Sequence, residues 1–300
     1  LHSFPTRRSS DLLGARLFDI ANTVLMILVI LATLYPLYYV AIVSVSNGNA
    51  VLRGEVKLVP VGFTLAAYKL VFRTATVVRS LGNSVLYTTV GTLINLFMTA
   101  LCAYPLARPR YSLRKFFTWM VTLTMFFSGG LIPLYLLILQ LGLRNTIWSL
   151  VLPVAISPWN MFIMRTYFQG IPEEIYEAAM IDGANDLQTL FRVILPVAKP
   201  IFATLLLFYA VGHWNEWFNA LIFLDDKVKM PVQLILRSVV IQGQMESAGY
   251  LMSPSEEQYM VVEQSLRYAT IMVSTLPILL VYPFVQKYFV RGVTIGSIKG

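Results

Sequence analysis

The chain has one cysteine and two histidines in 300 residues. A single cysteine excludes an internal disulfide, and Cys102 lies within an apolar run, where packing is the usual role of a free cysteine. The two histidines, His2 and His213, have no cysteine cluster beside them, so the sequence contains neither metal-ligand spacing nor a Cys/His nucleophile pair. We therefore expect no metal site, no catalytic residues and no enzymatic activity in this chain.

Charge is also scarce. Charged residues make up 13% of the chain and hydrophobic residues 57%, whereas average soluble domains carry about 25% charged residues. A soluble chain of this length needs more polar surface, so the composition indicates a membrane protein. The formal net charge of +8 comes from basic residues that flank apolar runs instead of clustering with aromatic residues. This pattern favours contact with membrane lipid and predicts no nucleic acid partner.

The apolar residues are gathered into long runs. A helix needs roughly 20 apolar residues to cross the hydrocarbon core of a bilayer. Six runs reach about this length, and the fifth is interrupted only by Glu216. They are continuous in Leu, Ile, Val, Phe and Met, without the alternation of a transmembrane strand. The predicted fold is therefore all-α, a polytopic membrane protein with six transmembrane helices at residues 20–46, 80–107, 116–140, 146–165, 200–224 and 268–287.

The predicted spans belong to one domain, residues 13–300. Residues 1–12 are polar and match nothing downstream, so we treat them as an unassigned tail or a sequence artefact. An even number of spans places both termini on one side of the membrane. The turn at residues 108–115 carries four basic residues, but the short loop between the third and fourth spans carries only Arg144. Because short cytoplasmic loops are enriched in Lys and Arg, we predict cytoplasmic termini.

The segment between the fourth and fifth spans, residues 170–197, has the pattern of two short helices. Pro172 suits the first position of a helix, and the two glutamates that follow it favour the positive end of the helix dipole. Gly183 is a plausible terminator of this helix. A second helix is expected at residues 187–194, before Pro196. Taken alone, this pattern is also typical of a generic amphipathic loop at the membrane surface.

The spacing within this loop is more specific than its helical pattern. It reads Glu177-Ala178-Ala179, three residues, Gly183, nine residues, then Val193-x-Leu195-Pro196. This order resembles the EAA loop of binding-protein-dependent ABC importer permeases, with Val193 where the family pattern has Ile. The wider sequence Asp182-Gly183-Ala184, with Phe191 and Pro200, is similar to the carbohydrate-uptake branch. The segments His213–Phe218 and Gln286–Phe289 resemble permeases of the polysaccharide and lipo-oligosaccharide type.

The resemblance implies a transport mechanism with partner subunits. The chain has no GxxxxGK[ST] phosphate loop, so ATP and Mg²⁺ are expected on two separate ATPase subunits and no cofactor on this chain. A second homologous permease and an extracytoplasmic solute-binding protein are the other implied partners. The implied location is the bacterial cytoplasmic membrane, with multiple spans. The residues expected to couple the permease to the ATPase are Glu177, Ala178, Ala179, Asp182, Gly183, Leu195 and Pro196.

A polar group near the outer end of the fifth span is a candidate for the solute path. Ionisable residues at such depth usually face a cavity or a partner, and aromatic faces with a carboxylate suit a sugar. The candidate residues are Trp214, Asn215, Glu216 and Trp217. Alternatively, Glu216 forms hydrogen bonds within the bundle or reaches the outer interface. In the long loop at residues 225–267, an apolar stretch at 232–241 suggests an amphipathic helix that either contacts the binding protein or only packs.

Two other functions remain open from the sequence. One is an ABC importer permease for a solute that is not a sugar. The other is a channel or secondary transporter that uses no ATPase, although the spans hold fewer charges than a proton-coupled carrier needs. The loop spacing favours the carbohydrate importer over both, but the sequence does not identify the solute.

Overall fold

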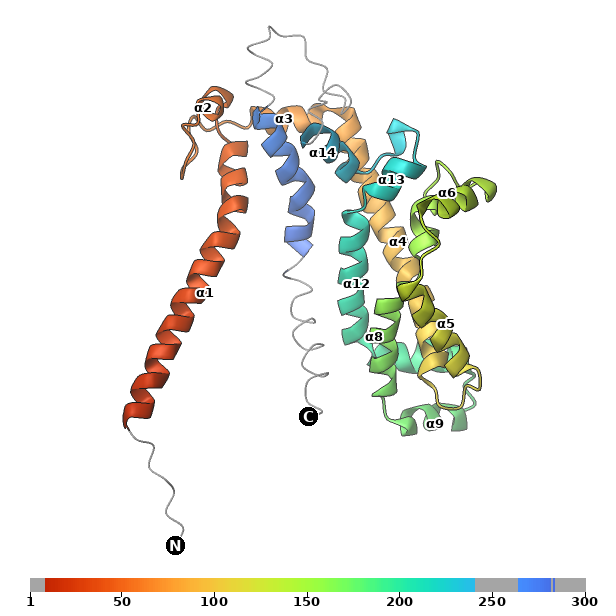
Figure 1. Ribbon diagram of the computed structural model, residues 1–300. Coiled ribbons are helices and arrows are strands. Elements are labelled where there is room, and N and C mark those ends of the chain that lie inside the picture. The colour runs from red at the N-terminus through yellow and green to blue at the C-terminus, as the bar shows by residue number, and fades with distance from the viewer. Residues whose placement is uncertain (1–8, 241–263, 282, 284–300) are drawn as a thin grey trace. The chain divides into compact units, whose positions relative to one another are not determined.

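A computed structural model describes residues 9–240, 264–281 and 283 of the chain (Figure 1). The described residues form helices and no strand, which confirms the all-α prediction. The chain divides into two compact units. The first comprises Leu1–Val71 and Met252–Met272, and the second comprises Phe72–Leu251 and Val273–Gly300.

The first unit contains the longest helix of the described chain. Helix α1, Ser9–Ser44, includes the last four residues of the predicted tail, and its window of highest hydropathy has no buried residues. The hydroxyls of Thr23 and Thr33 donate to the carbonyls one turn earlier, so neither polar group interrupts the apolar surface. Two short helices follow, α2 (Gly48–Leu52) and α3 (Ala66–Arg73).

The second unit is built around helix α4, Ala75–Ala107. It packs against α8 (Pro158–Gln169) and α12 (Lys199–Trp214), and Figure 1 shows the three helices side by side. A Cβ on Gly91 of α4 would lie 2.4 Å from Nε2 of His213 on α12. The contact between α4 and α12 at this level therefore requires a glycine.

Other helices of the second unit are short. They are α5 (Arg114–Phe126), α6 (Leu131–Gln140), α7 (Trp148–Val151), the 3-10 helix η1 (Leu152–Val154), α13 (Phe218–Phe223), the 3-10 helix η3 (Lys227–Lys229) and α14 (Val232–Val240). The loop between α8 and α12 holds α9 (Glu173–Ile181), α10 (Asp186–Gln188), the π-helix η2 (Thr189–Ile194) and α11 (Leu195–Val197). Helix α14 agrees with the amphipathic helix predicted at 232–241, except that residue 241 lies outside the described residues.

Several predicted spans are broken. Three described helices are long and apolar enough to cross a membrane, Gly14–Ser44, Ala75–Ala107 and Gln264–Val281, and the number rises to five if each of two bent helix pairs counts as one span. One bent pair joins α5 and α6 at 116°, and the other joins Asp186–Val197 and α12 at 87°. The predicted fifth span ends as a helix at Trp214 and resumes only at Phe218. The count of six spans stays a prediction, and residues 282 and 284–287 of the sixth lie outside the described residues.

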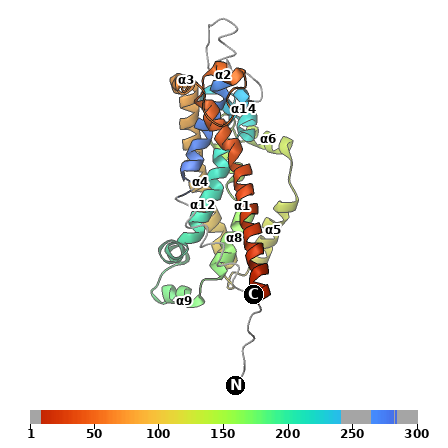
Figure 2. The same ribbon diagram turned by 90° about the vertical axis from the view of Figure 1, so that its left-hand side faces the viewer.

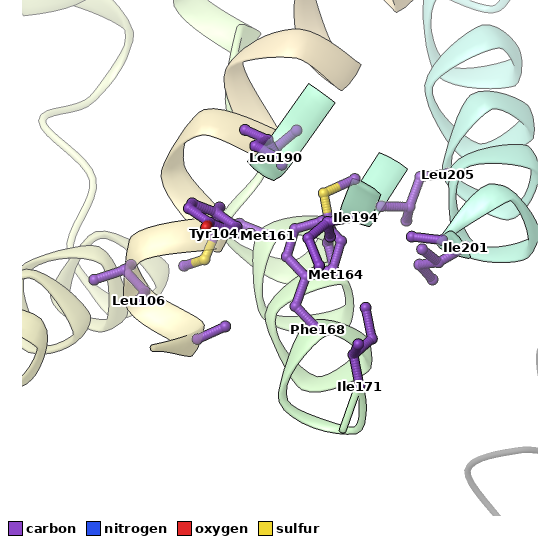
Figure 3. Close-up of a cluster of buried hydrophobic side chains, with 14 of the residues drawn as sticks. Tyr104, Leu106, Met161, Met164, Phe168, Ile171, Leu190, Ile194, Ile201 and Leu205 are labelled. Atoms are coloured by element: carbon purple, nitrogen blue, oxygen red, sulfur yellow. The ribbon is translucent and has the colours of Figure 1, made fainter. Parts of the chain in front are cut away.

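A buried cluster holds the second unit together at the end nearest the 170–197 loop. Figure 3 shows Met161, Met164 and Phe168 of α8 among side chains from α4, η2 and α12. Met161, Met164 and Ile194 are fully buried. Because this core includes residues of both α8 and η2, it fixes the two ends of the loop.

Candidate functional site

The first helix of the 170–197 loop has clear ends. Pro172 lies just before the helix and not at its predicted first position, because its ψ of 137° is extended and not helical. Glu173 and Glu174 lie in the first turn, where carboxylates interact favourably with the helix dipole. At the other end Gly183 has φ 77°, and the amides of Gly183 and Ala184 donate to the carbonyls of Met180 and Ala179. This is a Schellman arrangement, which confirms the predicted terminator.

The second half of the loop differs from the single helix predicted at 187–194. The Asn185 side chain accepts from the Gln188 amide at 2.9 Å, and the Gln188 side chain accepts from the Asn185 amide at 3.0 Å. This capping box starts α10, which continues as the π-helix η2 and then α11. Pro196 lies inside α11 and has no amide to donate, so the regular hydrogen-bond ladder is interrupted shortly before the 87° bend.

Most of the predicted coupling residues are accessible at the surface. Glu177, Ala178, Asp182, Gly183 and Pro196 are exposed, while Leu195 is half-buried and Ala179 is buried. Figure 2 shows α9 beyond the end of α8. The loop therefore presents small residues at the surface and keeps Ala179 as part of its packed side.

Apolar side chains beside these small residues were missed by the sequence reasoning. Ile181 is 86% exposed, and Met180 and Leu187 are also exposed. The signal was available, since Ile181 lies next to Asp182 and Gly183 at the end of an otherwise amphipathic helix. Large apolar groups that protrude beside small residues are suited to insertion into a partner's pocket.

The buried side of α9 is anchored by Tyr176. Its side chain is almost completely buried, and its hydroxyl donates to the Phe168 carbonyl of α8 at 3.1 Å. The guanidinium carbon of Arg108 lies 3.9 Å from the centre of the Tyr176 ring, and Nη2 of the same arginine lies 3.2 Å from a Glu173 oxygen. Burial raises the pKa of the Tyr176 phenol to about 12, although the nearby Arg108 charge lowers it. Tyr176 therefore remains a neutral donor at physiological pH.

A second ion pair joins the same two segments at the surface. Nη2 of Arg110 lies 3.6 Å from a Glu177 oxygen, and both side chains are more than half exposed. Exposed pairs of this kind contribute about 0–1 kcal/mol to stability. Glu177 therefore stays available to another partner at little energetic cost.

The four predicted solute-path residues each contact a different residue. Trp214 is buried and its indole donates to the Ser274 carbonyl at 2.9 Å. Glu216 accepts from the amide and the side chain of Asn219 at 2.8 and 3.0 Å, which places its carboxylate at the start of α13. Asn215 accepts from Gln233 at 3.4 Å, and the guanidinium carbon of Arg237 lies 4.8 Å from a Trp217 ring.

A cavity of about 220 Å³ lies beside one of these four residues. Trp214 contributes to its wall, and Asn215, Glu216 and Trp217 do not. The remaining lining residues come from α4, α12 and the last described helix; they are Val85, Thr88, Thr89, Leu207, Ala210, Val211, Pro277, Ile278 and Val281. The wall is mainly apolar, with two threonine side chains from α4.

Comparison with known proteins places this architecture in a family. Residues 12–295 match the family described as the inner membrane component of binding-protein-dependent transport systems. The chain belongs to this family. It is a transport permease component, as the resemblance of its loop predicted, and the prediction that it is not an enzyme agrees with this family.

The relatives of this permease include transporters of complex carbohydrates. It is 41% identical over 287 residues to protein LplC of Bacillus subtilis (strain 168), covering 96% of each chain. It is 39% identical over 290 residues to the polygalacturonan/rhamnogalacturonan transport system permease protein YtcP of the same organism, covering 95% of this chain and 99% of the relative. A crystal structure of a bacterial ABC transporter that imports the acidic polysaccharide alginate contains a chain with a TM-score of 0.83 and 34% identity, covering 96% of this permease and 100% of that chain.

A buried polar network inside the permease was also missed by the sequence reasoning. Asn95 of α4 hydrogen-bonds with the His213 ring at 2.5 Å, and its amide group also donates to the Val154 carbonyl. One turn along α4, the Thr99 hydroxyl lies 2.7 Å from the Tyr209 hydroxyl, which in turn accepts from the Ser157 amide. These bonds satisfy backbone groups where the predicted fourth span is interrupted, as a membrane interior requires.

Proposed function

We propose that this chain is the membrane-spanning subunit that couples ATP hydrolysis on two partner subunits to the import of a carbohydrate. The observation that carries the proposal is the exposed 170–197 loop, whose small and apolar surface residues lie on a helix fixed to α4 and α8. Closure of the ATPase pair would displace this helix and switch the bundle between outward-facing and inward-facing states.

The proposed partners follow from the family. They are a second homologous permease, two ATPase subunits that bind ATP and Mg²⁺, and an extracytoplasmic solute-binding protein. The proposed orientation has six spans, with both termini and the 170–197 loop in the cytoplasm, and it is supported by the four basic residues in the turn at 108–115. The names of the relatives support an oligosaccharide as the solute, in particular an acidic or pectin-derived one.

The proposal is tested by uptake into proteoliposomes that contain the assembled complex and enclose Mg-ATP. The binding protein is added outside with tritiated trigalacturonate, tritiated arabinotriose or a tritiated tripeptide. We expect accumulation of one of the sugars with ATP and none with ADP. Uptake of the tripeptide alone would identify an importer of another solute, and equilibration without ATP would identify a channel or secondary transporter.

Substitutions of Glu216 distinguish a role in contacting the solute from a structural role. If Glu216 contributes to the solute path, Glu216→Gln removes its charge and we expect lower uptake per assembled complex, because a lost hydrogen bond to a bound hydroxyl costs roughly 1–3 kcal/mol. Uptake is normalised to the complex recovered after gel filtration.

The two possible roles of Glu216 predict different results for a second variant, Glu216→Ala. If its bonds to Asn219 are its whole role, Glu216→Gln is mild and Glu216→Ala lowers the amount of folded permease, since the start of α13 loses both bonds. Unchanged normalised uptake in both variants would remove Glu216 from the solute path.

A further inference from the structure

Arg108 occupies an unusual position for a charged residue. It is the first residue after α4, its side chain is only 11% exposed, and it lies between two residues of α9. Its guanidinium lies over the Tyr176 ring and also pairs with the Glu173 carboxylate. Because these two residues are three positions apart on α9, they lie on the same face of that helix, and both contact the Arg108 side chain.

Tyr176 extends this contact to a third helix. Its hydroxyl donates to the Phe168 carbonyl of α8, and its ring centre lies 6.3 Å from that of Tyr104 on α4. Nε of Arg165 on α8 donates to the Leu106 carbonyl at 3.0 Å, which ties α8 to the end of α4 independently of α9. Helices α4, α8 and α9 therefore meet in one bonded junction.

The neighbouring ion pair differs from this junction in burial. Arg110 and Glu177 join the same turn to the same helix, but both are more than half exposed. Solvent screens an exposed pair and the long side chains keep their freedom. A buried, stacked guanidinium has one arrangement, and removing it leaves its partners without their contact. Arg108 therefore holds α9 through a buried contact, and Arg110, two residues later, contacts α9 only through an exposed ion pair.

A series of contacts connects this junction to α12 and to the cavity. Helix α4 contacts α12 through the Thr99–Tyr209 and Asn95–His213 hydrogen bonds. Gly91, one turn from Asn95, leaves the space that the His213 ring of α12 occupies. Thr88 and Thr89, further along α4, line the cavity beside Trp214. Packed and bonded groups therefore connect the end of α4 to α12 and to the cavity wall.

We propose that Arg108 and Tyr176 are positioning residues of the transport cycle. They make α9, α4 and α8 move as one body, so that displacement of α9 by the ATPase changes the cavity between α4 and α12. This inference rests on the proposed coupling function and adds the residues through which the coupling enters the bundle. Arg110, despite its ion pair with Glu177, has no such role.

The test measures cavity exposure and ATP hydrolysis in the same assembled complex. Thr89→Cys is introduced into a Cys102→Ser background, and its modification rate by N-ethylmaleimide is compared without nucleotide and after trapping with Mg-ATP and vanadate. The test variants are Arg108→Met and Tyr176→Leu. Arg110→Met is the matched control, and Tyr176→Phe keeps the ring under Arg108 while losing only the hydrogen bond to Phe168.

We expect the parent and Arg110→Met to show the same nucleotide-dependent change in modification rate. In Arg108→Met and Tyr176→Leu that change is expected to fall about fivefold or more, while ATP hydrolysis and ATPase association persist. Tyr176→Phe should lie between these groups. This loss of response at unchanged hydrolysis is not produced by a residue that serves stability alone.

Two results would overturn the inference. One is a parental nucleotide response in Arg108→Met. The other is a reduced yield of assembled Arg108→Met complex in which each remaining complex responds normally, which would assign Arg108 to folding. A parent complex that itself shows no nucleotide-dependent change would instead contradict the proposed coupling function, so the two failures are distinguishable.

Discussion

Gly183→Leu is expected to abolish ATP-driven uptake while leaving the permease inserted in the membrane. Gly183 has φ 77°, a conformation that costs an L-residue roughly 1–2 kcal/mol. No atom outside its chain neighbours lies within 4 Å of the position of a Cβ, so the added Cβ meets no other part of the described chain. It would instead occupy the exposed surface that the proposed ATPase approaches. The measurement is ATPase retention on the affinity-purified permease, together with uptake.

The control for Gly183→Leu is Gly142→Leu. Gly142 has φ 66° and also has no atom within 4 Å of a Cβ position, but it lies between α6 and α7, away from the loop. The backbone penalty is therefore matched and the proposed docking surface is untouched. Normal ATPase retention and normal uptake in Gly183→Leu would contradict the assignment of this loop.

Gly91→Ala is expected to destabilise the permease although alanine favours helices. The added Cβ would lie 2.4 Å from Nε2 of His213, closer than packed atoms approach, and the ring is held by Asn95. Overpacking of this kind costs typically about 1–3 kcal/mol, which at most of that range is larger than the gain of about 1 kcal/mol in helix propensity. Gly91→Leu adds more volume at the same site, so we expect almost no folded protein. Thermal aggregation followed by gel filtration in detergent measures both effects.

Gly82→Ala is the matched control on the same helix. Gly82 is in α4 and no atom lies within 4 Å of its Cβ position, so the substitution should be neutral or stabilising. The double variant Gly91→Ala/His213→Ala removes the ring from the new methyl group and should recover part of the lost stability. If Gly91→Ala behaves like Gly82→Ala, the close contact of α4 with α12 is not a feature of the folded permease.

The 170–197 loop shows how far local sequence information reaches. Pro172, two glutamates and Gly183 predicted a helix with the observed C-terminus, because dipole and backbone preferences act within one turn. The same reasoning failed for the second half, where a regular helix was expected and a π-helix is found. Pro196 was read there as a stop, but packing of Ile194 and Leu190 into the core keeps the chain helical past that point.

The hydrophobic runs show a different limit. Hydropathy sums transfer free energy over a window, so it detects apolar length and not the path of the backbone. The predicted third span contains Gly129 and Gly130, and the structure bends there by 116°. Those glycines were a local signal of the bend, and a count of charge-free residues does not register them.

By itself, the sequence determined that this is a helical membrane protein. It also contained the loop motif by which this permease resembles its family. Each of these depends on composition or on spacing within a few turns, where the physical preferences are local. Only the tertiary structure decided that Arg108 is buried against Tyr176, that Asn95 bonds to His213, and that Trp214 lines a cavity while Glu216 bonds to Asn219. Most of these contacts join helices far apart in the chain, and the local sequence around a side chain does not specify a partner on another helix.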